Sequence, residues 1–294
     1  MLRSLVPAVA MALLAALPGL AWAKKPAPAI SSEARWKVSL EGAAQPAGMA
    51  QRLRVVVKDH RGRAVGKVAD SHGAPMHVFA FSEDLAELVH LHPERKRGAF
   101  EAAWTPPRAG RYVVWAQFHP EGGAPQSVST ELRVPGEAPP PFDPARDRAT
   151  SRSNGHELVV WRKADTAPRS GPLTLRFDVR QAGTGAALHD FEEIAGVRAH
   201  LVAVKVGAPE RVLVHAHAHE EAKHHETEWH GENPHAGPSD QARYRPQAST
   251  PEGQLAFDVT FPEPGTYRFW VQYRRQGRDA QHAFTIDVNE GAAK

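Results

Sequence analysis

The chain has 294 residues, a formal net charge of +3 and no cysteine. The absence of cysteine excludes a disulfide framework and any thiolate chemistry. Charges of both signs are interspersed and no basic stripe is present, which argues against nucleic acid as a partner. Histidine is the unusual component, with 17 residues.

The N-terminal segment has the pattern of a secretory signal peptide. Arg3 gives the positive start, residues 6–20 form an apolar run, and Ala21-Trp22-Ala23 offers the small residues of a cleavage site. The run is short and interrupted by two prolines, so it is a poor membrane span. We expect residues 1–23 to be removed and the mature protein, without a membrane span, to be periplasmic or secreted.

The sequence after this segment repeats itself. The string Leu88-Val89-His90-Leu91-His92 returns as Leu213-Val214-His215-Ala216-His217, and residues 107–118 align with 262–273. Such self-similarity indicates one structural unit built twice. We assign the first unit to residues 34–134, a Pro-rich linker to 135–155 and the second unit to 156–288.

Both units consist of short runs of alternating polar and apolar residues separated by Gly, Pro and Asp turns, a pattern typical of strands. About seven strands in each unit, with almost no helical periodicity, predict an all-β protein of two tandem immunoglobulin-like antiparallel β-sandwiches. The expected strands of the first unit are 36–40, 51–58, 76–81, 88–92, 100–104, 110–119 and 127–134. Those of the second are 157–162, 173–180, 200–205, 212–217, 255–261, 265–274 and 282–288.

Histidines occupy equivalent positions in the two units. Residues i and i+2 of a strand face the same side, so His90 and His92 share one face. His77, on the preceding strand, can meet them through strand pairing. The second unit repeats this trio as His200, His215 and His217. Three neutral imidazoles at this spacing can bind one divalent metal ion, which predicts one such site in each unit. A solvated polar face is the alternative.

A long insertion in the second unit, residues 218–250, has no counterpart in the first unit and carries a further group of histidines interspersed with glutamates. Its composition and lack of periodicity predict a loop that captures metal weakly and adaptably. The expected ligands of this loop are His219, His224, His225, His230 and His235.

The ligand types restrict the metal. Imidazole suits Cu(II), Zn(II) and Ni(II), and the general affinity order favours copper. Met49 and Met76 are the methionines left after the signal peptide, which argues against a dedicated thioether site for Cu(I). We expect Cu(II), with Zn(II) or Ni(II) as alternatives.

The string Gly73-Ala74-Pro75-Met76-His77-Val78, then His90-Leu91-His92-Pro93-Glu94 and Pro107-x-x-Gly110-x-Tyr112, resembles the YtkA-like group of small exported bacterial domains. These domains are immunoglobulin-like and often accompany copper-handling proteins. The resemblance covers most of each unit, and it implies a role for the histidines of the two trios. The long insertion departs from the pattern and more closely resembles the metal-collecting loops of periplasmic zinc-binding proteins.

Enzymatic readings fit the sequence less well. A cupin-like enzyme needs a histidine after its Pro-x-Gly turn, where Tyr267 and Arg268 stand here. A dismutase-like enzyme has a stabilising disulfide, which this chain cannot form. No nucleophile elbow or phosphate-binding glycine loop is present.

We therefore expect a non-enzymatic protein that binds metal ions for buffering, resistance or delivery. Its partners would be an envelope metal transporter or a metalloprotein client. The alternatives are a structural or interaction module of an envelope complex and, less favoured, a metal-dependent β-scaffold enzyme of the cupin-like or dismutase-like kind.

Overall fold

The computed structural model describes residues 36–42, 45–65, 67–71, 73–162, 170–218 and 253–290. The segment expected to be a signal peptide, residues 1–23, lies outside them. Within the described residues the chain forms β-strands and one turn of 3₁₀ helix. None of the helical structure found there is long and apolar enough to cross a membrane.

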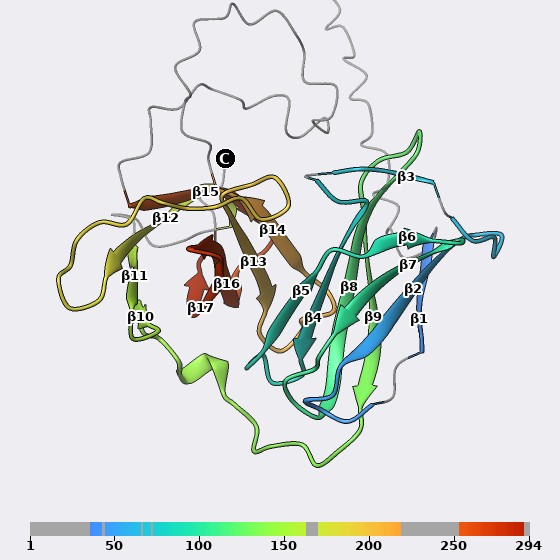
Figure 1. The fold of residues 1–294 in the computed structure, drawn as a ribbon, viewed down its shortest axis with the longest axis horizontal. Helices are drawn as coiled ribbons and strands as arrows, with labels where there is room; N and C mark the ends of the chain where they lie inside the picture. The colour runs from blue at the N-terminus through green and yellow to red at the C-terminus, as the bar shows by residue number, and fades with distance from the viewer. Residues whose placement is uncertain are drawn as a thin grey trace, which may run out of the picture. The chain divides into compact units, whose positions relative to one another are not determined.

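The first half is a sandwich of two antiparallel sheets (Figure 1). One sheet has the order β1-β2-β7-β6. The other has the order β5-β4-β8, with β9 along β8 and β3 paired to the end of β8. The strands are β1 (Trp36–Glu41), β2 (Gln51–Asp59), β3 (Val68–Ala69), β4 (Met76–Ser82), β5 (Leu88–Leu91), β6 (Glu94–Lys96), β7 (Ala99–Trp104), β8 (Gly110–Pro120) and β9 (Gln126–Val134).

The second half repeats this arrangement, with sheets of order β10-β11-β12-β15 and β14-β13-β16-β17. Its strands are β10 (Ser151–Ser153), β11 (Glu157–Arg162), β12 (Gly171–Gln181), β13 (Ala199–Lys205), β14 (Leu213–His217), β15 (Gln254–Phe261), β16 (Gly265–Arg275) and β17 (Arg278–Val288). The strand pairs β4–β5 and β13–β14 are therefore equivalent. The chain is all-β and consists of two immunoglobulin-like sandwiches in tandem, as the alternation of its residues predicts.

Three strands, β3, β6 and β10, were not predicted from the sequence. They have two or three residues each, which is too few to show a period. The segment 135–155, expected to be a linker, is not linker throughout. It contains the 3₁₀ turn η2 (Pro144–Arg146), and β10 pairs with β11, so the second sandwich begins inside the segment.

Each half has its own apolar core, built by the side chains that alternate towards the inside of the sandwich. Val55, Val78 and Phe100 belong to the first core, and Phe177 and Phe269 to the second. Two buried tyrosines fix the turn before β8 and β16. Tyr112 Oη donates to the carbonyl oxygen of Arg108 at 3.0 Å, and Tyr267 Oη to that of Glu263 at 2.9 Å. Tyrosine corners of this kind are a feature of immunoglobulin-like sandwiches.

A third apolar cluster contains residues from both halves, and the described residues of the two halves belong to one compact unit. Phe79, Phe81 and Trp115 of the first half pack here with Val202 and Trp270 of the second. The Trp115 indole Nε1 donates to the carbonyl oxygen of Pro209 at 2.8 Å. The two tryptophans at equivalent strand positions are thus buried where the halves meet.

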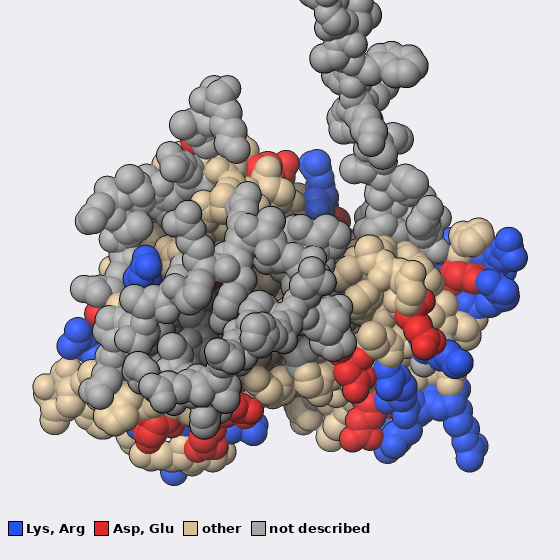
Figure 2. Space-filling model, turned by 90° about the horizontal axis from the view of Figure 1, so that it is seen from above, with Lys and Arg blue, Asp and Glu red and all other residues tan. Residues whose placement is uncertain are grey.

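The charged surface agrees with the small net charge. In Figure 2, Lys and Arg lie beside Asp and Glu over the described residues of the visible face. Arg54, for example, pairs with Glu101 at 2.8 Å and Glu41 at 3.2 Å. Exposed pairs of this kind contribute little to stability. No large patch of only positive or only negative charge is visible over the described residues in this view.

Candidate metal centre

The histidines lie on the outer face of each sandwich, and the period of the strands places them there. On β4, Met76 and Val78 point into the first core, so His77 and Phe79 point to the other face. All seven residues of β4 are buried, because the outer face is covered too. On β13, Leu201 points into the second core while Val202 joins the shared apolar cluster.

The strand pairing completes each trio. His90 lies opposite Phe79 in the β4–β5 register, and His200 lies opposite His217 in the β13–β14 register. Ring centroids within the first trio are 4.5–5.4 Å apart. Those within the second are 4.6–5.4 Å apart. The two trios therefore have nearly the same geometry.

The two trios form a single cluster. The sequence predicts one site in each half, but the ring centroids of His90 and His200 are 4.9 Å apart and those of His77 and His215 are 5.1 Å apart. The contact between His90 and His200 is therefore equivalent to that between His215 and His77, with the two halves exchanged. The outer faces of the two sandwiches meet, so the two predicted trios adjoin, and His200, His215 and His217 also form a group of close donor atoms within the second half. The histidines brought together are His77, His90, His92, His200, His215 and His217.

Within each trio, two ring nitrogens face each other. His77 Nδ1 is 3.2 Å from His90 Nε2, and His200 Nδ1 is 3.1 Å from His215 Nε2. Two ligands held about 2 Å from a tetrahedral ion lie about 3.3 Å apart. The separation of the facing nitrogens therefore matches that of two ligands of one metal ion.

The other ring nitrogens are held by hydrogen bonds. His77 Nε2 donates to the carbonyl oxygen of Ser71, and His200 Nε2 to that of Ile194, each at 3.1 Å. A carbonyl oxygen only accepts, so each Nε2 carries the proton and Nδ1 keeps its lone pair. Metal-binding histidines commonly have such a partner, which fixes the orientation of the ring.

The other ring of each facing pair, His90 or His215, contacts a glutamine of the opposite half. His90 Nδ1 is 2.9 Å from Gln272 Oε1, and His215 Nδ1 is 2.8 Å from Gln117 Oε1. The amide oxygens accept these Nδ1 protons, which leaves Nε2 of His90 and His215 with a lone pair. Each facing pair of nitrogens then presents two lone pairs and no proton.

The surroundings keep the imidazoles neutral. His77 is 2% exposed and His200 is fully buried. The Phe79 ring lies 4.4 Å from that of His90 and 4.9 Å from that of His215. Burial first, and then the neighbouring imidazoles, lower the pKa of His90 and His215 well below the ordinary value. Neutral imidazole is the form that binds metal.

His92, at the edge of the cluster, adds a further donor. Burial lowers the pKa of His92, and its Nε2 atom is buried without a hydrogen-bond partner. A buried polar atom of this kind is uncommon and is often explained by an ion or a water molecule.

The ligand sets consist of histidine alone. Among the described residues, two groups have donor atoms that all lie within 4.8 Å of one another: His77 with His90 and His215, and His200 with His215 and His217. The first group combines ligands from both halves. Three or four imidazoles without a carboxylate suit Zn(II) and Cu(II) better than Mg(II) or Ca(II), which prefer oxygen.

The predicted loop ligands cannot be placed. His219, His224, His225, His230 and His235 all lie outside the described residues, as does most of the loop 218–250. Metal capture by this loop therefore stays a prediction.

The residues that surround the histidines were not predicted from the sequence. Gln117 and Gln272 occupy equivalent positions in the repeat, two residues after Trp115 and Trp270, and this equivalence was the available signal. Phe79 was assigned to a strand but not to the centre. His119, near the end of β8, is not in the cluster; it donates through Nε2 to the carbonyl oxygen of Gly123 at 2.6 Å.

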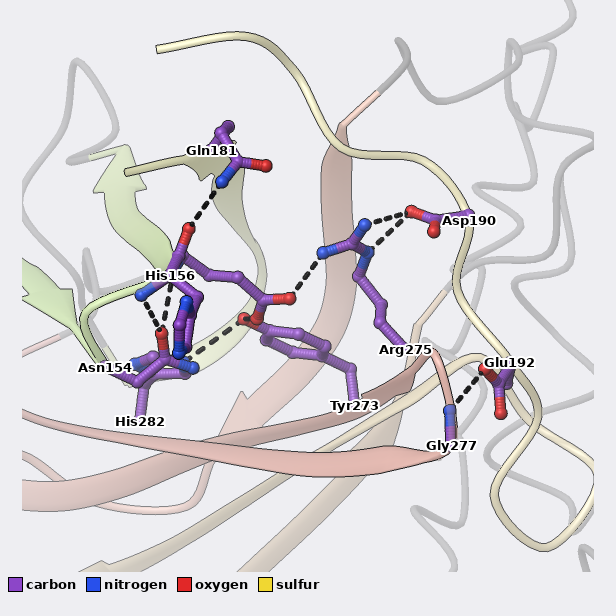
Figure 3. A network of polar contacts seen from close by, with 10 residues as sticks. Asn154, His156, Gln181, Asp190, Glu192, Tyr273, Arg275, Gly277 and His282 are labelled. Atoms are coloured by element: carbon purple, nitrogen blue, oxygen red, sulfur yellow. Dashed lines mark hydrogen bonds and ion pairs between the residues drawn. The ribbon is translucent and has the colours of Figure 1, made fainter. Parts of the chain in front are cut away.

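A second polar network lies in the core of the second half (Figure 3). Tyr273 Oη donates to Glu157 Oε2 at 2.6 Å, and the other oxygen of Glu157 accepts from Arg275. Arg275 also pairs with Asp190, and His282 stacks on the Tyr273 ring at 5.7 Å. Because the buried charges in this network are paired, it is explained by structure rather than by ligand binding.

The comparison with family models decides what the chain is related to. A model described as a domain of unknown function (DUF8832) matches residues 31–136 and again residues 154–290. The chain belongs to this family. Each half contains one DUF8832 domain, and no curated protein sequence matches the chain.

Several solved structures match most of this DUF8832 chain at low similarity. Invasin, a bacterial integrin-binding protein, is 12% identical over 87% of this chain and 39% of its own, with a TM-score of 0.25. The Escherichia coli adhesin FdeC is 15% identical over 87% of this chain and 64% of its own, with a TM-score of 0.23. The titin domains Z1Z2 are 12% identical over 88% and 98%, with a TM-score of 0.20.

Proposed function

We propose that this protein binds a transition-metal ion at the histidine cluster shared by its two halves. The observation that carries the proposal is the pair of 3.1–3.2 Å contacts between ring nitrogens whose protons are directed elsewhere. Two lone pairs at this distance repel each other unless a cation lies between them. A metal ion beside a facing pair accepts both lone pairs of that pair and removes this repulsion.

Copper is the favoured metal, followed by zinc and nickel. The donors are neutral imidazoles, which suit all three divalent ions, and the general affinity order favours Cu(II). The thioether of Met76 points into the first core rather than to the cluster, so no sulfur ligand is proposed. The resemblance of the motifs to the YtkA-like group agrees with copper.

The proposed role is non-enzymatic handling of metal outside the cytoplasm, in the periplasm or after secretion. The shared cluster would hold the ion, while the histidines of the loop 218–250 collect ions and pass them on. An envelope transporter or a metalloprotein client would receive them. Buffering, resistance and delivery are all compatible with a protected site fed by an adaptable chelating segment.

The test uses the full chain with the five loop histidines replaced by serine, so that only the cluster competes for metal. In this background the double variant His90→Asn and His215→Asn removes one nitrogen from each facing pair. The asparagine amide can still donate towards the glutamine that holds Nδ1. His119→Asn removes a histidine outside the cluster and is the matched control.

We expect the loop variant to bind Cu(II) tightly, with nitrogen couplings from several imidazoles in its electron paramagnetic resonance spectrum. The double variant should lose at least about 100-fold in affinity, more than the loss of a single supporting residue causes. The His119→Asn control should bind as before. Equal affinities in the double variant and the control would refute the proposal and favour a structural or interaction module.

A further inference from the structure

We infer that Gln117 and Gln272 determine which ring nitrogen of the cluster binds metal, each acting on a histidine of the opposite half. The inference rests on the proposed function and adds a condition to it. The cluster is competent to bind metal only when the two halves are docked, because each half supplies the glutamine that the other requires.

The orientation of Gln272 follows from a chain of hydrogen bonds. Gln281 Nε2 donates to the carbonyl oxygen of Leu88 at 3.3 Å, which directs Gln281 Oε1 towards Gln272. Gln272 Nε2 donates to that Oε1 at 2.6 Å. Because a carbonyl oxygen only accepts, the direction of both amides is fixed, and Gln272 Oε1 faces His90 Nδ1.

Gln117 has the equivalent position on β8. Its Nε2 donates to Ser127 Oγ at 3.3 Å, and its Oε1 lies 2.8 Å from His215 Nδ1. Ser127 is the strand partner of Gln117, as Gln281 is of Gln272. The two arrangements are therefore equivalent, although the residue behind each glutamine differs.

The glutamines matter because each histidine has a competing tautomer. His77 Nδ1 is an acceptor, since its Nε2 donates to Ser71. If His90 carried its proton on Nε2, it would donate that proton to His77 Nδ1 across 3.2 Å. This hydrogen bond would occupy both lone pairs that the metal needs. An acceptor at His90 Nδ1 draws the proton to the other side of the ring and keeps the pair open.

The same competition applies to the second pair. His200 Nδ1 is the acceptor, His215 Nε2 lies 3.1 Å from it, and Gln117 Oε1 takes the proton of His215 Nδ1. The glutamines are thus positioning residues. They do not touch the metal, and they act through the histidine that does.

The experiment measures the tautomer of His215 in the metal-free full chain by nitrogen-15 magnetic resonance of labelled imidazoles. Gln117→Met keeps the length of the side chain and removes the acceptor. We expect His215 to shift from the Nδ1–H to the Nε2–H form and the affinity for Cu(II) to fall 10- to 100-fold. Affinity is measured with the loop histidines replaced.

Gln117→Glu is the rescue variant, because a carboxylate accepts from both His215 Nδ1 and the Ser127 hydroxyl. It should restore the Nδ1–H form and an affinity at least equal to that of the parent. Gln126→Met, on the neighbouring strand, removes an amide that donates to the carbonyl oxygen of Ala124 and should change neither measurement.

An unchanged His215 tautomer and affinity in Gln117→Met would overturn the inference. If Gln117→Met disturbs the fold, the test is Gln117→Glu. A Gln117→Glu variant without the Nδ1–H form of His215 and the parent affinity for Cu(II) would also overturn the inference. The tautomer is measured without metal, so its outcome is separate from that of the proposed function. A chain that holds the Nδ1–H form and binds no metal would refute the proposed function alone.

Discussion

The buried carboxylate of Glu157 gives the sharpest prediction about stability. Glu157 is 9% exposed and is shared by Tyr273, which donates to it at 2.6 Å, and by Arg275. Glu157→Gln keeps the shape of the side chain and removes its charge. A hydrogen bond to a charged group contributes about 1.5–3 kcal/mol and a neutral one about 0.5–1.5 kcal/mol, so the Tyr273 bond should lose about 1 kcal/mol.

The ion pair adds to this loss. Removing one partner of a buried pair costs about 3–5 kcal/mol, but Arg275 retains Asp190 at 2.6 Å, which reduces the cost. We therefore expect Glu157→Gln to lower the free energy of unfolding by about 2–3 kcal/mol. The assay is urea unfolding of the full chain with a chelator present, followed by tryptophan fluorescence.

The control is Asp279→Asn, which neutralises an ion pair between β16 and β17 of the same sandwich. Asp279 pairs with Arg274 at 2.6 Å, but its side chain is 65% exposed, and exposed pairs contribute little. The unfolding midpoint of this variant should stay near that of the parent. If Glu157→Gln shifted the midpoint no more than Asp279→Asn, the reasoning that burial makes this charge costly to lose would be refuted.

Three further outcomes follow from the described residues. Burial lowers the pKa of His282 to about 4, so the unfolded chain takes up the proton first and stability should fall as pH drops from about 6.5 towards 4. Unfolding midpoints at pH 7 and 4.5 should show a smaller fall in His282→Gln, and equal falls would contradict this. With the loop histidines replaced, native mass spectrometry should detect one divalent ion per chain, because no described carboxylate joins the cluster to offset the repulsion between two ions; two ions would show otherwise. Phe79→Ala should cost about 3–5 kcal/mol in a thermal unfolding assay, since the fully buried ring packs on His90 and His215, and an unchanged midpoint would show that the site collapses.

The sequence by itself determined the longer strands, the internal repeat and the face of each strand on which the histidines lie. A period of two residues places His90 and His92 on one side of a strand whatever surrounds it, and the internal repeat places His215 and His217 likewise. The prediction of two β-sandwiches was confirmed for the same reason, since alternation is a local property. The shortest strands were missed because two or three residues contain no period.

Only the tertiary structure decided what the histidine faces meet. Nothing in the spacing of His77 or His200 says that the two outer faces pack together, because that contact depends on shape and apolar area over two whole sheets. A local signal was present: the strands carrying these residues are apolar on both faces, as Phe79 and Val202 show. His90 and Gln272 are 182 positions apart in the sequence, and they form a hydrogen bond only because the two halves pack together.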